Sequence, residues 1–521
     1  MDSPVVSRLF RQLFRHLDCR PRRNFAFLAS SLQLARRHQL HHQQHRPYAS
    51  APRRDRSNES DWQQRTDLFP ADMSVEYAEY PMVTAQDLRL RRERPRRVKM
   101  LMRDFIEDSL YNPHYGYFSK QVVIFTPGEP FRFTEMRDEP EFSAILSQRY
   151  SDFEDGLDAA AVAQGGEPSE TRQLWYTPTE LFRPHYGEAV ARYLVANYML
   201  TSFPYDDLII YEMGAGRGTM MLNILDYLRV HEPAVYARTR YRIIEISSSL
   251  ASLQRRELHG SPATSPAATA AADRGHGDRV EIINQSVFDW TTPEPSPCFF
   301  LAFEVFDNFA HDCVRYDLAS QQPLQAVVLV AADGDLYEFY QPQLDPVAAR
   351  FLRVRNAATA GHYPLPFSRN PLVRALRRGL FSTGPAHTPS LSRPEYLPTR
   401  LLDFFAVLAR FFPAHRLLTS DFHALPDAIT GLNAPVVQTR FQRRPVPVST
   451  PLVHQGYFDI MFPTDFTVVE ALYRAVTGKH SRVATHEHFM RNWASLDQTR
   501  TRSGESPLLS WYKNASMLAT I

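Results

Sequence analysis

The chain has 521 residues, of which 44% are hydrophobic and 12% aromatic, enough to bury one large core or two domains. Its net charge of +2 gives no general reason to expect nucleic acid as a partner, and no run of 18 apolar residues predicts a membrane span. Cys19, Cys298 and Cys313 have neither metal-ligand spacing nor the pattern of a disulfide framework, so no metal site is predicted.

The first 54 residues have an uneven charge distribution. They hold eleven Arg, no Lys and only two acids, and apolar residues recur every three or four positions around Arg8, Arg11 and Arg15. An Arg-rich, acid-poor amphipathic start is typical of a mitochondrial presequence; a disordered basic tail or a nucleic-acid-binding arm is the alternative. We therefore predict a presequence, otherwise disordered, over residues 1–54, processing after Tyr48, and a mature protein in the mitochondrial matrix.

Composition shifts divide the remaining chain. A helix is predicted over residues 98–110, and the acidic stretch 119–172 is expected to be an irregular surface insertion. Residues 255–279 and 354–400 are rich in small, polar, basic or proline residues and are expected to be disordered. The expected order is a linker at 55–95, an N-terminal helical region at 96–200, the main domain at 201–480 and a C-terminal extension at 481–521.

A glycine-rich turn stands between a predicted strand and a predicted helix. Residues 208–210 are an apolar run, and apolar residues from Met220 onward recur at helical spacing. Between them Gly214, Gly216 and Gly218 give the pattern E-x-G-x-G-x-G. Strand, turn and helix in this order build a pocket at the carboxyl edge of a parallel sheet, where glycine lets the backbone approach a ligand. A glycine turn without any ligand is the alternative interpretation.

The glycine spacing distinguishes two cofactor classes. Dinucleotide-binding folds use G-x-G-x-x-G, which places pyrophosphate on the helix N-terminus, so an NAD-dependent oxidoreductase is disfavoured. The observed spacing resembles the first motif of class I S-adenosylmethionine-dependent methyltransferases. Further strands are predicted downstream, with a hairpin around Asp333-Gly334 and a helix over 401–412. The predicted strands cover 207–213, 241–246, 280–284, 298–303 and 416–421.

Several polar residues follow the predicted strands directly. Glu245 ends the second strand, where a carboxylate can accept protons from both hydroxyls of a ribose; a solvated strand-end acid is the alternative. Ser286 and Val287 follow the third strand and would face an adenine ring. Glu304 and Asp307 follow the fourth strand, where two acids would orient a cationic methyl acceptor such as a guanidinium. Asp307 is also suited to cap the next helix.

Six blocks of sequence together resemble the mitochondrial complex I assembly methyltransferases, the MidA-like family. They appear in the family's order between about residues 98 and 475, and the cofactor loop matches most closely. The blocks are 105–118, 177–188, 212–219, 244–254, 304–307 and 456–466.

The resemblance implies a fold, a cofactor and an activity. The fold is the class I methyltransferase Rossmann-like α/β fold, with a seven-stranded mostly parallel sheet, an N-terminal helical extension and insertions. The activity is transfer of a methyl group from S-adenosylmethionine to an arginine of an iron–sulfur core subunit of complex I during its assembly. Cofactor-binding residues would be Glu212, Gly214, Ala215, Gly216, Gly218, Thr219, Glu245, Ser286 and Val287, with Glu304 and Asp307 as the catalytic pair.

The chain departs from the family pattern on the acceptor side. Phe303 stands where the family has Asn, residues 308–310 replace its A-L-P, and residues 420–423 stand where it has a D-Y-G strand end. These departures leave a second hypothesis open, in which the chain is a diverged assembly scaffold that binds the cofactor or a subunit without transferring a methyl group.

Overall fold

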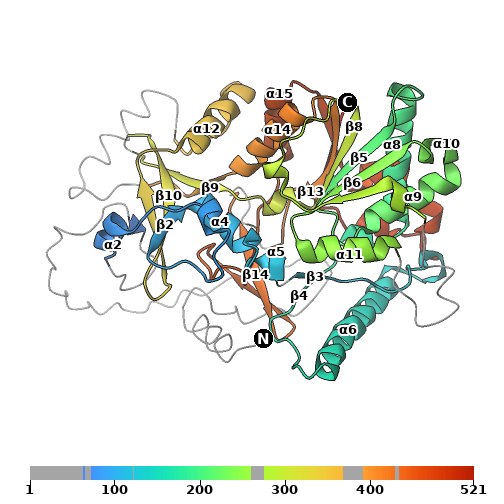
Figure 1. Ribbon diagram of the computed structural model, residues 1–521, viewed down its shortest axis with the longest axis horizontal. Coiled ribbons are helices and arrows are strands. Elements are labelled where there is room, and N and C mark those ends of the chain that lie inside the picture. The colour runs from blue at the N-terminus through green and yellow to red at the C-terminus, as the bar shows by residue number, and fades with distance from the viewer. Residues whose placement is uncertain are drawn as a thin grey trace, which may run out of the picture.

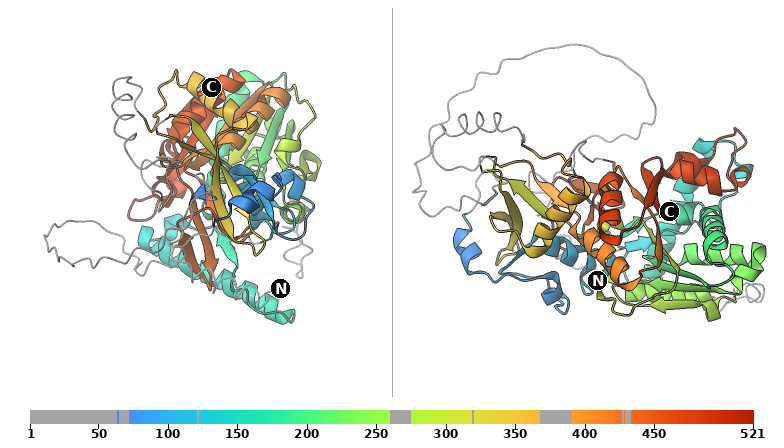
Figure 2. Two further views of the ribbon diagram at one scale, coloured as in Figure 1. Left: turned by 90° about the vertical axis from the view of Figure 1, so that its left-hand side faces the viewer. Right: turned by 90° about the horizontal axis from the view of Figure 1, so that it is seen from above.

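The computed structural model describes residues 63–64, 72–120, 122–259, 275–318, 320–367, 391–426, 428 and 433–521. Figure 1 shows a large sheet flanked by helices on one side of the molecule and a second, smaller sheet on the other. Seen from above in Figure 2, the two sheets lie at opposite ends of the long axis, and helices α14 and α15 lie between them. The predicted presequence lies outside the described residues.

The large sheet has seven strands. All neighbouring pairs from β7 to β13 are parallel, and β18 is antiparallel to both of its neighbours. This arrangement confirms the predicted α/β fold with a mostly parallel seven-stranded sheet. The spatial order is β7 (Val280–Ile283), β6 (Thr239–Ile244), β5 (Leu208–Met213), β8 (Cys298–Phe303), β13 (His415–Phe422), β18 (Ala515–Thr520) and β17 (Ser481–Thr485).

The chain reverses direction across the sheet between β5 and β8. From β5 it proceeds to β6 and β7 on one side, and from β8 to β13 on the other. Such a switch point leaves a crevice at the carboxyl ends of the two central strands, and ligands of open α/β sheets bind there. The glycine loop after β5 and the acids after β8 therefore share one edge of the sheet.

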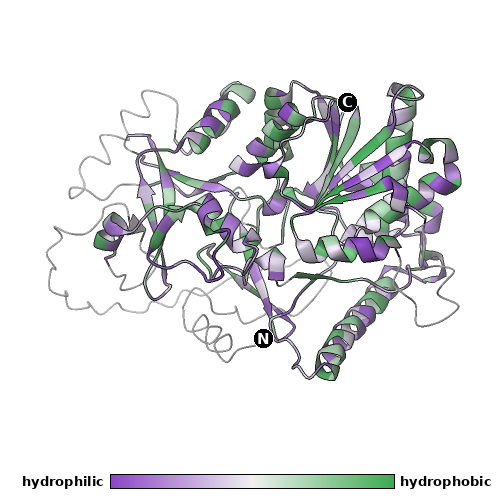
Figure 3. Cartoon of the chain, in the orientation of Figure 1, coloured by the Kyte–Doolittle hydropathy of each residue, from purple (hydrophilic) through white to green (hydrophobic). Residues whose placement is uncertain are grey.

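Two apolar layers of helices cover the sheet. In β5, Leu208 and Ile210 pack into one layer while Ile209 and Tyr211 pack into the other, because alternate strand residues face opposite ways. Figure 3 shows the central strands as predominantly apolar. One layer includes α8 (His185–Thr201), α9 (Thr219–His231) and α16 (His486–Trp493); the other includes α12 (Pro346–Ala358), α14 (Thr399–Phe411) and α15 (Phe466–Thr477).

The second sheet is antiparallel. Its hairpin β10–β11 turns around Asp333-Gly334, as predicted, and β2 pairs with β10. The predicted helix over 98–110 is wrong in its first turn, because residues 98–101 form a strand opposite residues 327–330 before α4 begins. The strands are β1 (Gln63–Gln64), β11 (Leu336–Gln341), β10 (Pro323–Val330), β9 (Asp312–Tyr316), β12 (Glu395–Leu397) and β2 (Val98–Leu101), with α4 (Met102–Tyr111) packed on them.

The acidic stretch 119–172 is not irregular, contrary to the expectation. Nearly half of it is the long helix α6 (Glu139–Ala163), which projects from the body in Figure 1. Asp138 caps its first turn by accepting the Glu141 N–H at 3.0 Å, and the Arg440 guanidinium lies 3.1 Å from the buried Glu154 carboxylate. Local charge therefore stabilises a helix whose sequence lacks a strong apolar stripe.

Three further boundaries differ from the expectation. The expected linker contains two helices before residue 95. Each of the two stretches expected to be disordered begins within a helix, because α11 continues to His259 and α12 continues to Ala358. The expected C-terminal extension instead supplies two strands of the large sheet, β17 and β18. No helix among the described residues is long and apolar enough to span a membrane.

The remaining elements connect these layers. Two small sheets lie beside α6, one parallel and one antiparallel. The other helices and strands are α2 (Ser74–Glu79), α3 (Ala85–Leu88), α5 (Tyr117–Lys120), α7 (Pro178–Leu181), α10 (Pro233–Tyr236), α11 (Ser248–His259), α17 (Pro507–Ser510), β3 (Val122–Ile124), β4 (Gln173–Trp175), β14 (Val436–Phe441), β15 (Arg444–Val448) and β16 (Asp459–Met461).

Candidate functional site

The glycine loop turns sharply from β5 into α9. Gly214, Gly216 and Gly218 have φ angles of 73°, 54° and 83°, the left-handed region that favours glycine. A Cβ on Gly214 would lie 3.0 Å from Cγ2 of Val305, and one on Gly216 would lie 3.0 Å from Cδ1 of Ile124. The loop thus needs glycine both for its conformation and for its close packing, which explains the spacing seen in the sequence.

A buried acid stands at each side of this loop. The Tyr241 hydroxyl donates to Glu212 at 2.7 Å, and burial raises the pKa of Glu212 to about 7. Glu245 accepts the Ser247 N–H at 2.8 Å on one carboxylate oxygen and the Gln254 amide at 3.0 Å on the other. Burial also raises the pKa of Glu245 to about 7. Because Glu245 is held from both sides, its carboxylate has a fixed direction.

Gln254 connects the acid to the glycine loop. Its Nε2 donates both to Glu245 and, at 2.9 Å, to the carbonyl of Gly216. Its own Oε1 is buried and has no hydrogen-bond partner. Gln254 lies inside one of the sequence blocks that resemble the family, but the sequence alone gave it no role. The available signal was its position on α11, the helix that directly follows Glu245.

These residues fit S-adenosylmethionine. Each oxygen of Glu245 has a partner but keeps a further lone pair, so the carboxylate can still accept two ribose hydroxyls. Gly214 and Gly216 would lie against the amino-acid part, because glycine has no Cβ and lets the backbone come close to a ligand. The buried Oε1 of Gln254 offers one more acceptor in the same place. Glu245, Gln254 and the glycine loop would therefore hold this cofactor.

The predicted adenine side lies at the neighbouring strand ends. Val287 is buried at the start of a short 3-10 turn, and Ser286 caps that turn by accepting the Phe288 N–H at 3.3 Å. Ile246, which sequence analysis missed, follows Glu245 directly and is 44% exposed. A large apolar side chain left open beside an acid at this edge offers a purine ring an apolar surface. Its adjacency to Glu245 was the signal in the sequence.

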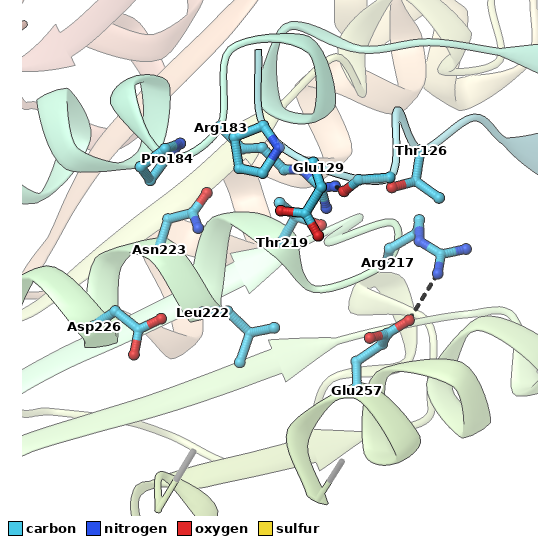
Figure 4. A pocket seen from close by; sticks show the side chains of 12 residues that line it. Thr126, Glu129, Arg183, Pro184, Arg217, Thr219, Leu222, Asn223, Asp226 and Glu257 are labelled. Atoms are coloured by element: carbon cyan, nitrogen blue, oxygen red, sulfur yellow. Dashed lines mark hydrogen bonds and ion pairs between the residues drawn. The ribbon is translucent and has the colours of Figure 1, made fainter. Parts of the chain in front are cut away.

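Two predicted cofactor residues have different surroundings. Ala215 is buried within the loop, where it adds no polar group. The Thr219 hydroxyl donates to the buried Glu180 carboxylate of α7, so it is already used within the fold. Thr219 also borders a cavity of about 440 Å³ on the helix side of the loop, where Arg217 forms an ion pair with Glu257 at 2.7 Å (Figure 4).

The acceptor side begins with an unusual backbone conformation. Glu304 directly follows β8 with a φ of 53°, a left-handed conformation that costs a residue other than glycine roughly 1–2 kcal/mol. Its N–H donates to the Ser420 carbonyl at 2.8 Å. Asp421, fully buried at the end of β13, accepts the N–H groups of Phe306 at 2.7 Å and Asp307 at 3.3 Å. Strained conformations of this kind cluster at functional sites.

The acids of this turn are close enough to influence one another. Burial, and then the Asp421 carboxylate, raise the pKa of Glu304 to about 8. Burial and the carboxylates of Asp421, Asp459 and Glu304 also raise the pKa of Asp307 well above its ordinary value. The charges that act most strongly on Glu304 and Asp307 are thus all negative, which makes this a place where a bound cation is stabilised.

Asp307 does not cap a helix. It lies inside the short 3-10 turn Phe306–Asn308, which has no side-chain cap, and its Oδ1 is buried without a hydrogen-bond partner. The capping alternative is therefore wrong, and the Asp307 carboxylate keeps an unused acceptor. Among the residues that the structure describes, no group of three or more His, Cys, Asp or Glu side chains is arranged to hold a metal ion.

Two other sequence blocks brace the acceptor side. The Tyr115 hydroxyl and the Gln455 amide both donate to the buried Asp108 carboxylate, at 2.8 Å and 2.6 Å. A Cβ on Gly456 would lie 1.8 Å from the Tyr115 carbonyl oxygen, so only glycine allows these segments to meet. Asn308, next to Asp307, donates to Asp459 at 2.8 Å. The blocks at 105–118 and 456–466 therefore support the turn that carries the acids.

Two known proteins are similar to this chain. The chain is 25% identical over 418 residues to a mitochondrial protein of Schizosaccharomyces pombe named as a protein arginine methyltransferase NDUFAF7 homolog, covering 76% of this chain and 80% of that protein. A protein of Burkholderia thailandensis solved with S-adenosylhomocysteine covers 81% of this chain and 87% of its own, with 14% identity and a TM-score of 0.47.

Residues 189–485 match the family described as "Putative S-adenosyl-L-methionine-dependent methyltransferase". This range spans more than half of the chain and includes the glycine loop, Glu245 and the acids after β8. The cofactor is therefore S-adenosylmethionine, and the chain belongs to this family of S-adenosylmethionine-dependent methyltransferases.

Proposed function

We propose that this chain is a protein arginine methyltransferase of the mitochondrial matrix, which modifies an iron–sulfur core subunit of complex I during assembly. The observation that carries the proposal is the group of mutually repelling acids Glu304, Asp307 and Asp421 beside the glycine loop. The printed name of the fungal relative supports arginine as the acceptor and the mitochondrion as the compartment. The choice of a complex I subunit as the substrate rests on the resemblance of the sequence blocks to the complex I assembly methyltransferases.

A guanidinium suits this group of acids. It stays charged across the physiological pH range and carries five N–H donors, so it both relieves the repulsion and satisfies several carboxylate oxygens. Among the described residues, neither acid has a cationic partner in the free protein. Oδ1 of Asp307 has no hydrogen-bond partner, and the pKa of Glu304 is raised rather than lowered. A bound guanidinium would lower both pKa values by opposite charge.

The chain's own residues would then assist transfer. S-adenosylmethionine, when bound, supplies an electrophilic methyl group, and it would leave as S-adenosylhomocysteine when the bond between its sulfur and that methyl group breaks. Glu304 and Asp307 would hold the guanidinium so that one nitrogen faces the glycine loop, and would localise its positive charge on the other nitrogens. As the new N–C bond forms, that nitrogen becomes acidic, and a carboxylate oxygen of Glu304 would take its proton. Asp421 would keep the turn in place through its two backbone hydrogen bonds.

The scaffold alternative rests on one observation. Phe303, which stands where the family has Asn, packs its ring against Tyr186 at 6.1 Å beside Glu304, so this side is more apolar than the family pattern. A scaffold would bind the cofactor and a subunit without transferring a methyl group. Mass spectrometry of methylarginines in complex I subunits, from cells with and without this chain, separates the two: the proposal expects one site to disappear, and an unchanged set favours the scaffold.

The raised pKa of Glu304 predicts a pH dependence. Below a pKa of about 8 the side chain is mostly protonated, and only the ionised form can pair with the guanidinium and take its proton. We therefore expect kcat/KM for the acceptor to rise with pH, with a midpoint near 8, because this ratio reports groups of the free enzyme. Rates are measured at saturating cofactor, since Glu245 titrates near 7. A flat profile across this range contradicts the assignment of Glu304.

The Arg-rich start predicts import into mitochondria. A reporter fused to residues 1–60 should enter mitochondria and lose its first roughly 48 or 49 residues. Replacing Arg8, Arg11 and Arg15 with Glu should leave it in the cytosol, because the positive face of the amphipathic stretch is lost. N-terminal sequencing and cell fractionation give the answer, and a mature chain that still begins at Met1 excludes a cleaved presequence.

A further inference from the structure

The C-terminal segment reaches the acceptor side of the site. Tyr512 follows the short helix α17 and precedes β18, so it lies outside residues 189–485, which match the family. Its ring lies 6.1 Å from that of Phe422, the residue after Asp421, and 5.8 Å from that of His486. Tyr512 is therefore placed beside the end of β13, next to the strand that carries Glu304.

The hydroxyl of Tyr512 is buried but unused. The side chain is only 7% exposed, and its oxygen has no hydrogen-bond partner. After burial, the Glu304 carboxylate is the strongest influence that raises the pKa of Tyr512, in line with the position of the ring beside Phe422 and His486. A buried polar group without a partner is costly and is rare in folded proteins, so such an atom calls for an explanation.

A second tyrosine approaches Glu304 from the other end of the chain. Tyr186, at the start of α8, is fully buried, and its ring packs against Phe303 at 6.1 Å and His486 at 5.9 Å. Burial, and then the Glu304 carboxylate, also raise its pKa. Segments from before and after the matched range thus bring two phenol groups to one acid, and both hydroxyls are buried without a hydrogen-bond partner.

We propose that the Tyr512 hydroxyl, together with the Glu304 carboxylate, binds the cationic acceptor side chain. This inference deepens the proposed function and rests on it. A guanidinium has five N–H donors and no acceptor, so it needs several oxygen atoms around it. Glu304 supplies two, and the Tyr512 oxygen supplies another. The hydroxyl lacks a partner in the free protein because its partner is the substrate.

The proposal makes Tyr512 a substrate-binding residue rather than a stabiliser of the fold. Removing an unpartnered buried hydroxyl leaves the packing of the ring intact and removes a desolvation cost, so Tyr512→Phe should melt at the same temperature or higher. Cofactor affinity should not change, because the ring of Tyr512 packs against Phe422 and His486 on the acceptor side. The loss should appear only in acceptor binding, as a higher KM with a smaller change in kcat.

The test uses the full chain saturated with S-adenosylhomocysteine and titrated with two small probes. The first is N-acetylarginine methylamide, and the second is the neutral isostere N-acetylcitrulline methylamide. Wild type should prefer the arginine probe, and Tyr512→Phe should weaken that preference about tenfold, the effect of one hydrogen bond to a charged group. Tyr340→Phe, which removes a buried hydroxyl from β11 of the other sheet, is the matched control and should bind as wild type.

The outcomes separate this inference from the proposed function. Equal arginine affinity in wild type and in folded Tyr512→Phe overturns the role of Tyr512, even if arginine is methylated. If wild type binds the arginine probe and Tyr512→Phe does not, yet no methyl group is transferred, the inference stands and the enzymatic proposal fails. If wild type does not distinguish arginine from citrulline, both are wrong.

Discussion

Replacing Glu304 with Gln is expected to reduce methyl transfer by about 10²–10⁴-fold, the usual contribution of a positioned acid–base group. The carboxamide keeps the size of the side chain but carries no charge and cannot take the proton from the guanidinium. Cofactor affinity should stay nearly unchanged, because Glu245 and the glycine loop are the residues proposed to hold the cofactor, and both lie outside the turn after β8. Transfer rates and isothermal titration with S-adenosylmethionine measure the two quantities separately.

Folding should not limit the Glu304→Gln experiment. The pKa of Glu304 is about 8 in the folded chain and ordinarily 4.5, so the folded state resists ionisation and loses stability as pH rises between these values. Removing the charge should therefore raise the melting temperature above pH 8. The matched control is Glu338→Gln in β11, where burial also raises the pKa of a carboxyl group, but far from the glycine loop. Parallel loss of cofactor affinity would instead place Glu304 in the cofactor site.

Replacing Gly214 with Val is expected to abolish binding of S-adenosylmethionine. The backbone there has a φ of 73°, and a Cβ would already lie 3.0 Å from Cγ2 of Val305 before the branched carbons are added. A β-branched residue is poorly tolerated in this conformation, and its methyl groups would fill the space into which the cofactor's amino-acid part fits. Titration calorimetry should show no binding, while far-ultraviolet circular dichroism should keep its wild-type shape.

A second glycine gives the control for backbone strain. Gly478, at the end of α15, has a φ of 70°, and a Cβ there would meet nothing within 4 Å. Gly478→Val therefore imposes a similar conformational cost without blocking the loop, and it should lower stability but keep cofactor affinity. If Gly214→Val and Gly478→Val lose affinity equally, strain alone explains the result and Gly214 does not border the cofactor.

The centre of the fold could be predicted because its signals are local. The run that forms β5 is apolar except for Glu212, since the strand is buried on both faces, and the three glycines occupy left-handed conformations that other residues disfavour. The hairpin at Asp333-Gly334 carries its own turn residues. Each of these features is determined by residues that are adjacent in the sequence. The structure contains the strand, the glycine loop and the hairpin.

The errors arose where distant residues decide the structure. Residues 98–101 continue the pattern of α4, yet they form a strand because residues 327–330 pair with them. Helix α6 buries few apolar residues and is held by Arg440 from the small sheet, a contact that no local pattern reveals. β18 inserts between β13 and β17 and so joins the end of the chain to the main sheet.

The same distinction applies to the candidate site. The structure brings the predicted residues at the strand ends to one edge of the sheet. Glu212 was predictable from its place near the end of β5, and Gly214, Gly216, Glu245 and Glu304 from their places after strands. The contribution of Asp421 was not, because it reaches the Phe306 N–H across 115 residues of chain. Gln254 and Tyr512 likewise act through contacts that only the folded chain creates.

The measurement that tests the account most directly is the chemical identity of the transferred methyl group. The purified mature chain is incubated with S-adenosylmethionine labelled in its methyl group and with a matrix extract from cells that lack this protein. The labelled proteins are hydrolysed and their amino acids separated. The account predicts label in methylarginine from one complex I subunit, and its loss with Glu304→Gln. Absence of label, or label that persists unchanged with Glu304→Gln, would contradict it.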